Sequence, residues 1–346
     1  ICAAEQTTES GDWFQGTADA VRKHLRHIRN RRPSFYLILS GDQLYRMDYR
    51  TLLETHLRHK ADITVSTLPV TREAARAFGI MHVNPTGRIT RFVEKPQSEA
   101  ELSSLVTSPT LFKQFGLKVD EGRDYLASMG VYVFSADVLE ETLEREKDWI
   151  DFGQHVIPKT LKTRTVCAHL FDGFWEDIGT VRSYYEVSLS MTAPMSPFDF
   201  HDANHTIYSR PRYLAGSRIQ GGAIDDCIIC EGSHVGKAKI TKSIIGIRSV
   251  IHSGVTIDRS IVMGGDYYEG DPHAPLPAKG TSIPMGIGQN TVISGAIVDK
   301  NARIGKNVVI RGSQDLQDYS GDGFAIRDGI VIVLKGAVIP DGMHIG

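Results

Sequence analysis

The stretch Phe35–Tyr49, FYLILSGDQLYRMDY, decides the class of fold, because an apolar, β-rich segment stops abruptly there at Ser40-Gly41-Asp42. In open α/β sheets, ligands bind in the crevice beyond the carboxyl ends of the strands. A carboxylate at the end of a buried strand therefore places Asp42 where a metal–phosphate substrate would lie. An ordinary Ser-Gly-Asp turn fits the same letters, so the rest of the chain must decide between the two interpretations.

Composition limits the classes of function. The chain has 346 residues, of which 41% are hydrophobic, enough for two domains that each bury a core. A formal net charge of -2 excludes the broad basic field of a nucleic-acid-binding protein. The sequence contains neither an apolar run of the ~20 residues that span a bilayer nor a signal-peptide pattern. We expect a soluble protein whose partners are small phosphates, with no nucleic acid and no membrane.

The cysteines predict a reducing compartment. Four cysteines in a chain of this length do not make a disulfide framework. Cys227-Ile-Ile-Cys230 has the spacing of half a redox or zinc motif, but no second CxxC or HxxxH accompanies it. We expect a cytoplasmic protein of bacterial type, with the plastid stroma left open.

Hydrophobic spacing predicts helices and strands in alternation over the first half of the chain. The expected helices are 17–31, 49–59, 136–144 and 180–191. The expected strands are 35–39, 63–67, 80–83, 88–93, 129–134 and 165–170. Residues 97–123 show no sustained period and are expected to form a long irregular excursion. Alternating strands and helices favour an α/β domain with a mostly parallel sheet.

A different pattern takes over after a linker at 193–213, which Pro194, Pro197 and Pro211 frame. Helical spacing disappears, and aliphatic residues recur at steps of five or six. The residues that keep this step are Ile219, Ile224, Ile229, Val235, Ile240, Ile245, Ile251, Ile257, Val292, Val298, Ile304 and Ile310. Such a period predicts a β-helix over 214–346, in which each turn buries its aliphatic residue against the next. A β-sandwich would instead alternate at period two.

Polar residues with possible chemistry occur in separate segments of the first domain, and each is expected at a strand end. They are Asp42, the Glu94-Lys95 pair in FVEKP, Ser128 in LASMG and Asp177 in FWEDIGT. Two carboxylates converging from different strands can hold Mg²⁺, which prefers oxygen ligands and keeps several waters. Lys95 supplies a point charge for a sugar phosphate, and Glu94 can accept hydrogen bonds from sugar hydroxyls. Taken singly, these residues also have ordinary structural interpretations. Glu94-Lys95 fits a surface ion pair, Ser128 a hydroxyl at a strand end, and Asp177 a cap for the helix that follows.

An aromatic residue and a glycine precede the first expected helix in Trp13-Phe14-Gln15-Gly16-Thr17. Helix N-termini favour anions, and a glycine lets a flat base approach the backbone. This segment therefore predicts a nucleotide contact, while a core aromatic followed by a Thr17 cap is the alternative.

These motifs, in this order, resemble glucose-1-phosphate adenylyltransferase, the ADP-glucose pyrophosphorylase family. The resemblance rests on WFQGTADAV, LSGDQLYRMDY, FGIMHV, FVEKP, LASMGVYVF, FWEDIGT, YSRPRYL and the six-residue coil. It implies an incomplete Rossmann-like nucleotidyltransferase domain at 1–192, followed by a left-handed parallel β-helix at 214–346 for assembly and regulation.

The resemblance also implies a reaction and the residues that carry it. Glucose 1-phosphate would attack the α-phosphate of ATP in the presence of Mg²⁺, giving ADP-glucose and pyrophosphate for glycogen or starch synthesis. Asp42, Lys95 and Asp177 would be catalytic, and the two aspartates would bind the metal. The implied substrate contacts are Glu94, Lys95, Ser128 and Gly79 for the sugar phosphate, and Trp13, Gly16 and Thr17 for ATP.

Regulation and assembly follow from the same resemblance. Lys279 and Lys335 resemble positions that bind the phosphates of metabolite effectors, and the family implies a homotetramer. The Gly-rich loop that opens the family's domain does not occur in these 346 residues, so we expect little turnover from this polypeptide alone. Two alternatives remain: a non-catalytic regulatory subunit, which has no chemical need for Asp42, Lys95 and Asp177, and acyl transfer in the coil with His234 or His252 as base.

Overall fold

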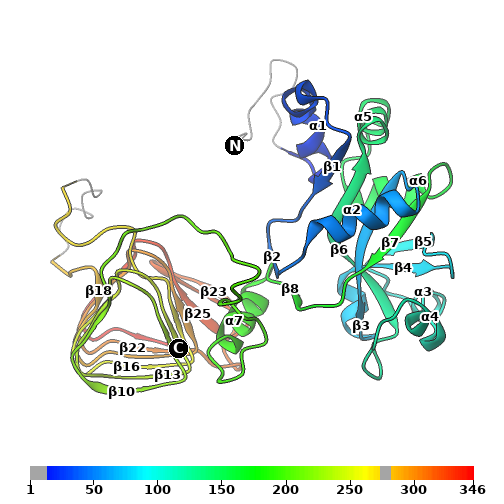
Figure 1. Cartoon of the computed structure of the whole chain (residues 1–346). Helices are drawn as coiled ribbons and strands as arrows, with labels where there is room; N and C mark the ends of the chain where they lie inside the picture. Colours follow the sequence, from blue (N-terminus) through cyan, green and yellow to red (C-terminus); the bar gives the residue numbers. More distant parts are fainter. Residues whose placement is uncertain (1–13, 273–281) are drawn as a thin grey trace. The chain divides into compact units, whose positions relative to one another are not determined.

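The computed structural model describes residues 14–272 and 282–346 (Figure 1). These residues divide into two compact units. The first contains residues 14–41 and Arg46–Trp175, and the second contains Asp42–Tyr45 and Glu176–Gly346. Within the two described ranges, no helix is both long and apolar enough to cross a membrane.

The first unit is built on a six-stranded sheet with the order β5-β4-β6-β3-β7, in which β1 also pairs with β6. Its strands are β1 (Phe35–Ile38), β3 (Ile63–Val70), β4 (Gly79–Val83), β5 (Ile89–Glu94), β6 (Tyr125–Ser135) and β7 (Val166–Leu170). The expectation of a mostly parallel sheet is wrong in detail, because only the β3–β7 pair is parallel. Strands β1, β3, β4 and β7 do run in one direction, but β6 lies among them in the opposite direction.

Helices surround this sheet (Figure 1). They are α1 (Thr17–Ile28), α2 (Tyr49–Arg58), α3 (Glu99–Ser103), α4 (Pro109–Gln114), α5 (Ala136–Arg145) and α6 (Ile157–Thr160), with single turns η1 (Arg29–Arg31), η2 (Ala74–Ala77) and η3 (Phe152–Val156). The helices predicted from spacing are confirmed to within a few residues. Helices α3 and α4 lie in the stretch that we expected to be irregular. Both are too short to show a period, and the side chains of Ser98 and Ser108 cap them.

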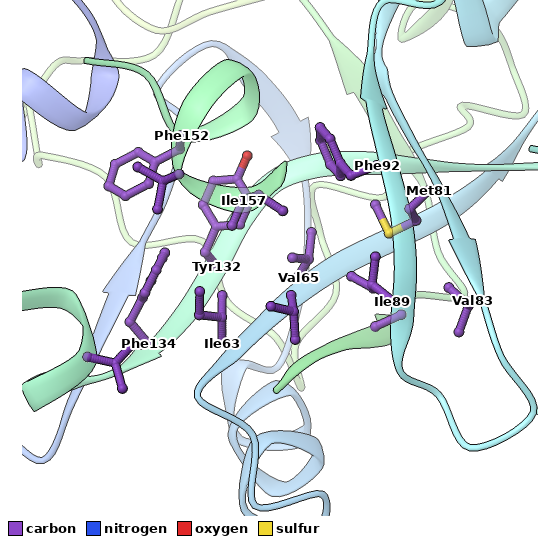
Figure 2. Packing of buried hydrophobic residues seen from close by; sticks show 14 of the residues in the cluster. Ile63, Val65, Met81, Val83, Ile89, Phe92, Tyr132, Phe134, Phe152 and Ile157 are labelled. Atoms are coloured by element: carbon purple, nitrogen blue, oxygen red, sulfur yellow. The ribbon is translucent and has the colours of Figure 1, made fainter. Parts of the chain in front are cut away.

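The core of the first unit fixes the positions of β6 and of the turn η3. Figure 2 shows Tyr132 and Phe134 of β6 beside Phe152 of η3, with Ile63 and Val65 of β3 next to them. The ring centroids of Phe152 lie 5.7 Å from Tyr132 and 5.6 Å from Phe134. Burying each of these large apolar side chains contributes about 1.5–3 kcal/mol. The segment that follows Ile150 is therefore held against the middle of the sheet.

Strand β1 is less buried than its apolar sequence predicts. Only Tyr36 is buried, whereas Leu37 is 41% and Leu39 is 44% exposed. Among the strands that the structure describes, β1 pairs with β6 alone and leaves its other edge unpaired. Asp42 thus follows a half-exposed edge strand and not the buried strand that we expected.

The second unit contains a coil of stacked parallel strands, which Figure 1 shows as layered, three-sided turns. One side consists of β9 (Arg218–Ile219), β12 (His234–Val235), β15 (Val250–Ile251), β18 (Gly286–Ile287), β21 (Arg303–Ile304) and β26 (Val338–Ile339). The next consists of β10 (Gly222–Asp225), β13 (Ala238–Thr241), β16 (Thr256–Asp258), β19 (Val292–Ser294), β22 (Val309–Arg311) and β27 (His344–Ile345). The third consists of β11 (Ile228–Ile229), β14 (Ile244–Ile245), β17 (Ile261–Val262), β20 (Ala296–Val298) and β25 (Ile330–Val333), which continues antiparallel into β24 (Phe324–Arg327) and β23 (Tyr319–Ser320).

The repeating aliphatic step produces this coil, because residues one turn apart pair in register and bury their side chains together. One such column is Ile240, Ile257, Ile293, Ile310 and Ile345, all buried. The predicted register is wrong by one residue at position 292, since Ile293 is the buried member. Ile219 and Ile224 are 46% and 39% exposed, because the first turn of the coil has a neighbouring turn on one side only.

A small ribbon and a helix complete the second unit. Strand β2 (Gln43–Tyr45) pairs with β8 (Trp175–Asp177) in a two-stranded sheet of their own. Helix α7 (Val181–Ser190) follows β8 and packs on the coil, so that it groups with the coil although it precedes the proline-rich segment.

Candidate functional site

Two carboxylates of the second unit meet at one glycine. The Ile178 N–H donates to the Asp42 carbonyl at 3.0 Å, and the Gly179 N–H donates to Oδ1 of Asp177 at 2.7 Å. A Cβ atom placed on Gly179 would lie 2.9 Å from Oδ1 of Asp177 and 3.2 Å from Oδ2 of Asp42. Both side chains therefore lie against the same small space, although 135 positions separate them in the sequence.

The chemistry of this pair suits one kind of metal ion. Among residues 14–272 and 282–346 there is no group of three or more histidine, cysteine or acidic side chains arranged to hold a metal. Mg²⁺ needs no such cage, since it is usually bound by one or two carboxylates, waters and substrate phosphates. Asp42 and Asp177 thus fit Mg²⁺ better than zinc, which prefers nitrogen and sulfur ligands in a closed shell.

Glu94 ends strand β5 in the first unit, opposite Gly79 on β4. A Cβ on Gly79 would lie 2.6 Å from Oε2 of Glu94, and one on Gly153 would lie 2.8 Å from the same atom. Two glycines thus make room for this carboxylate. Burial raises the pKa of Glu94, and the nearby charge of Asp151 raises it further, while Lys95 opposes the shift. The site therefore favours groups that donate hydrogen bonds to Glu94.

Lys95 follows directly and has an unusual backbone. Its φ angle of 47° lies in the left-handed region, which costs a residue with a side chain roughly 1 kcal/mol. Its N–H donates to the carbonyl of Phe78 at 3.0 Å, which fixes this conformation. The side chain is exposed, so the ammonium group is accessible to a ligand.

Ser128 is buried within β6, and not at a strand end as we expected. The pairing of β6 with β3 is irregular just beyond it, between Thr67 and Val65 of β3. The Ser128 hydroxyl accepts from the Gly130 N–H at 3.2 Å and lies 3.4 Å from the Tyr132 hydroxyl. Burial raises the pKa of Tyr132 to about 12, so this phenol stays protonated and able to donate.

Thr17 does not cap helix α1, contrary to one of our two interpretations, because Gly16 occupies the N-cap position. The Thr17 hydroxyl instead donates to Oδ2 of Asp151 at 2.9 Å and accepts from the Phe152 N–H at 3.1 Å. A Cβ on Gly16 would collide with the carbonyl oxygen of Ile150, which explains the need for glycine. Trp13, the remaining residue predicted on the ATP side, lies outside the described residues.

The segment 150–153 therefore links the two groups of residues predicted to contact ATP and the sugar phosphate. Asp151 binds Thr17, Gly153 lies against Glu94, and Phe152 packs on Tyr132. We did not predict this segment from the sequence. Its signal was the Asp-Phe-Gly string, in which Asp151 caps the following turn through the Gln154 N–H at 2.9 Å.

The coil carries a separate cluster of charges. Lys335 forms an ion pair with Asp266 at 3.0 Å, and Lys300 forms another with the same carboxylate at 2.8 Å. The Asn301 amide also donates to Asp266 at 3.1 Å. These contacts, that of Lys300 above all, hold the pKa of Asp266 well below its usual range. Lys279 lies outside the described residues.

A cleft of about 650 Å³ opens beside this cluster. Its lining includes Arg210, Arg212, Arg248, Lys300 and Asp266. Four cations and a single carboxylate give the cleft an excess of positive charge, which favours an anionic ligand.

Comparison with known families agrees with this geometry. Residues 1–193 match the family described as nucleotidyl transferase. The chain belongs to the nucleotidyl transferase family. Residues 212–344 match the GLGC left-handed parallel beta-helix domain. A nucleotidyltransferase domain followed by this β-helix is the architecture of glucose-1-phosphate adenylyltransferase, which confirms the fold class and the resemblance inferred from the motifs.

Proposed function

We propose that this nucleotidyltransferase transfers AMP from ATP to glucose 1-phosphate and so makes ADP-glucose, the glucosyl donor for glycogen or starch. The convergence of Asp42 and Asp177 on Gly179 is the observation that supports the proposal most. A carboxylate pair of this kind suits a divalent cation with a triphosphate, and the family match supplies the reaction class.

The reaction needs no covalent intermediate on the protein. A phosphate oxygen of glucose 1-phosphate forms a bond to the α-phosphorus of ATP, and the bond from that phosphorus to the bridging oxygen of the β-phosphate breaks. The electron pair leaves with pyrophosphate, so atoms and charge balance without a co-reactant. Catalysis of such a transfer depends on in-line positioning and charge neutralisation.

Residues of the first unit would bind and orient the sugar phosphate. The Lys95 ammonium offers a charge to the phosphate, and its fixed backbone limits where that charge can lie. Glu94 would accept hydrogen bonds from sugar hydroxyls, which suits its half-buried position between Gly79 and Gly153. Ser128 and the protonated Tyr132 add hydroxyl groups to the same cluster.

On the ATP side, Gly16 and Thr17 lie at the start of helix α1, where they themselves would contact the nucleotide, since the Ala18 and Asp19 N–H groups donate to the Ile150 carbonyl at 2.9 and 3.1 Å. The bond from Thr17 to Asp151 holds this helix start in place. Asp42 and Asp177 would hold Mg²⁺, which when bound neutralises negative charge on the phosphates.

The basic cleft of the coil is proposed as the site for phosphorylated metabolite effectors. Lys335 and Lys300 are already turned toward one acidic group, Asp266, so their charges are arranged to meet an anion. The exposed apolar first turn of the coil, with Ile219 and Ile224, is consistent with assembly into a homotetramer.

The experiment that tests the proposal measures pyrophosphate release from ATP and glucose 1-phosphate by the protein in its native length. Asp42→Asn keeps the shape of the side chain but removes its charge, and we expect the rate to fall by about 10²–10³-fold. An unchanged rate would favour the alternative of a non-catalytic regulatory subunit. Asp226→Asn, at a turn of the coil between β10 and β11, is the matched control and should leave the rate unchanged.

A further inference from the structure

Helix α7 is anchored on the coil by its apolar face. Tyr184, Tyr185 and Leu189 of the helix pack with Ile261 and Ile297 of strands β17 and β20. Both tyrosines are more than half buried, and burial raises the pKa of each. Helix α7 is therefore held against the coil by this packing.

Two polar contacts fix the helix to particular turns of the coil. The Tyr185 hydroxyl donates to the carbonyl of Arg259 at 2.5 Å, and the Arg182 guanidinium donates to the carbonyl of Asp328 at 2.5 Å. Arg259 and Asp328 both have left-handed φ angles, 41° and 52°, and lie at turns between strands. These contacts specify the position of the helix along the coil, which apolar packing alone does not do.

The segment between Asp177 and helix α7 is short and fully hydrogen-bonded through its N–H groups. Only Ile178, Gly179 and Thr180 separate Asp177 from α7. Their three N–H groups all donate: to the Asp42 carbonyl at 3.0 Å, to Oδ1 of Asp177 at 2.7 Å and to the Ser183 hydroxyl at 3.2 Å. A shift of α7 along the coil must therefore displace Asp177 or break one of these bonds.

We propose that Tyr185 and Arg182 are positioning residues for the Asp42–Asp177 pair. By holding α7 at the turns of Arg259 and Asp328, they set the spacing of the two carboxylates and hence their affinity for a divalent cation. The inference rests on the proposed function for the cation site, and it adds that the geometry of that site is determined from the coil. Residues that fix a ligand's orientation from outside the coordination shell commonly affect metal affinity strongly.

The chain offers matched controls on the same helix. Tyr184 is half-buried next to Tyr185, but its hydroxyl interacts with Ser188 of its own helix. Glu186 pairs with Arg182 at 3.2 Å without contributing to the bond with Asp328. A Tyr184→Phe/Glu186→Gln double variant therefore removes one hydroxyl and one charged partner while leaving both anchors in place.

The test measures Mn²⁺ binding to the native-length protein by the electron paramagnetic resonance signal of free Mn²⁺. For Tyr185→Phe/Arg182→Gln we expect the dissociation constant to rise about tenfold, at the lower end of such effects. The control variant should bind as the wild type does. The thermal unfolding temperatures of the two double variants should fall by similar small amounts. A loss of Mn²⁺ affinity in Tyr185→Phe/Arg182→Gln alone therefore cannot be explained by a general loss of stability.

Two outcomes would overturn the inference. If the dissociation constant is unchanged in Tyr185→Phe/Arg182→Gln while Mn²⁺ binding is lost in Asp177→Asn, the cation site is supported. Tyr185 and Arg182 are then not positioning residues for it. Undiminished Mn²⁺ binding in Asp177→Asn would instead refute the proposed cation site, and the inference with it.

Discussion

Two pairs of carboxylates in this protein differ in almost every physical respect. Glu94 and Asp151 lie in the first unit, packed around glycines and the buried Tyr132, where burial raises the pKa of Glu94. Asp42 precedes β2 and Asp177 ends β8 in the two-stranded ribbon of the second unit, where Oδ1 of Asp177 accepts from the Gly179 N–H.

The difference indicates which ligand each pair can accept. A half-buried carboxylate that already faces another negative charge gains from neutral hydrogen-bond donors such as sugar hydroxyls. A more open pair can take a hydrated cation, which keeps most of its waters. The same side-chain chemistry can thus suit two kinds of ligand, depending on burial and on neighbouring charges.

The largest expected effect separates the two pairs by the kinetic constant that each changes. Asp177→Asn should lower kcat by about 10²–10³-fold, because charge neutralisation on the phosphates is lost. Asp151→Asn should chiefly raise the KM for glucose 1-phosphate and ATP by loosening Thr17 and Phe152. Steady-state kinetics with each substrate varied will show this split, and equal losses in both variants would contradict separate roles.

A smaller effect is expected from filling the space at each pair. Gly179→Ala brings a methyl group 2.9 Å from Asp177, and Gly153→Ala brings one 2.8 Å from Glu94. We expect the first to raise the Mg²⁺ concentration needed for half-maximal rate, and the second to raise the KM for glucose 1-phosphate, each by about tenfold. Gly41→Ala, whose Cβ meets no atom within 4 Å, is the control.

The pH dependence of stability should distinguish Glu94 from an exposed acid. Because the pKa of Glu94 is raised in the folded protein, its protonated form favours folding, and that contribution is lost as pH rises through the raised value. Glu94→Gln should therefore gain in unfolding free energy relative to the wild type as pH rises above the ordinary pKa of a glutamate.

For Glu99→Gln we expect the unfolding free energy to change in the opposite direction. Arg72, and then Arg76, lower the pKa of Glu99, so its contribution is present at neutral pH and is lost as pH falls. That variant should be less stable than the wild type at neutral pH and approach it in acid. Chemical denaturation at several pH values measures both trends, and parallel curves for the two variants would refute the difference in burial.

The smallest effect concerns the coil. Asp266 competes with any anion for Lys300 and Lys335. Asp266→Asn should strengthen the binding of inorganic phosphate by several-fold, and Lys335→Gln should weaken it. Calorimetric titration with phosphate measures both changes, whereas Lys113→Gln on helix α4 should have no effect. If phosphate binding is insensitive to both substitutions, the cleft is not an effector site.

The coil was the region most open to prediction, because its stabilising contacts repeat along the sequence. One aliphatic residue per side, every five or six positions, is enough to specify the stack. The single error of register at Val292 arose because two aliphatic residues are adjacent there, and only pairing with Ile257 shows that Ile293 faces inward. The exposure of Ile219 followed from its place in the first turn, which no local pattern reveals.

The candidate site was only partly open to prediction for the opposite reason. Asp42, Glu94 and Asp177 each follow or end a short apolar segment, so a local pattern drew attention to them. Asp151 and Gly153 lie in a single irregular turn, and their importance comes from contacts with Thr17 and Glu94, which are distant in sequence. The direction of β6 was likewise set by long-range pairing and not by local alternation.

The most direct test of the proposed cation site measures Mn²⁺ binding to the wild type, to Asp42→Asn and to Glu94→Gln in the native-length protein. We expect Mn²⁺ binding to be lost in Asp42→Asn and kept in Glu94→Gln. Binding that survives in Asp42→Asn, or that disappears in Glu94→Gln, would contradict the proposed site.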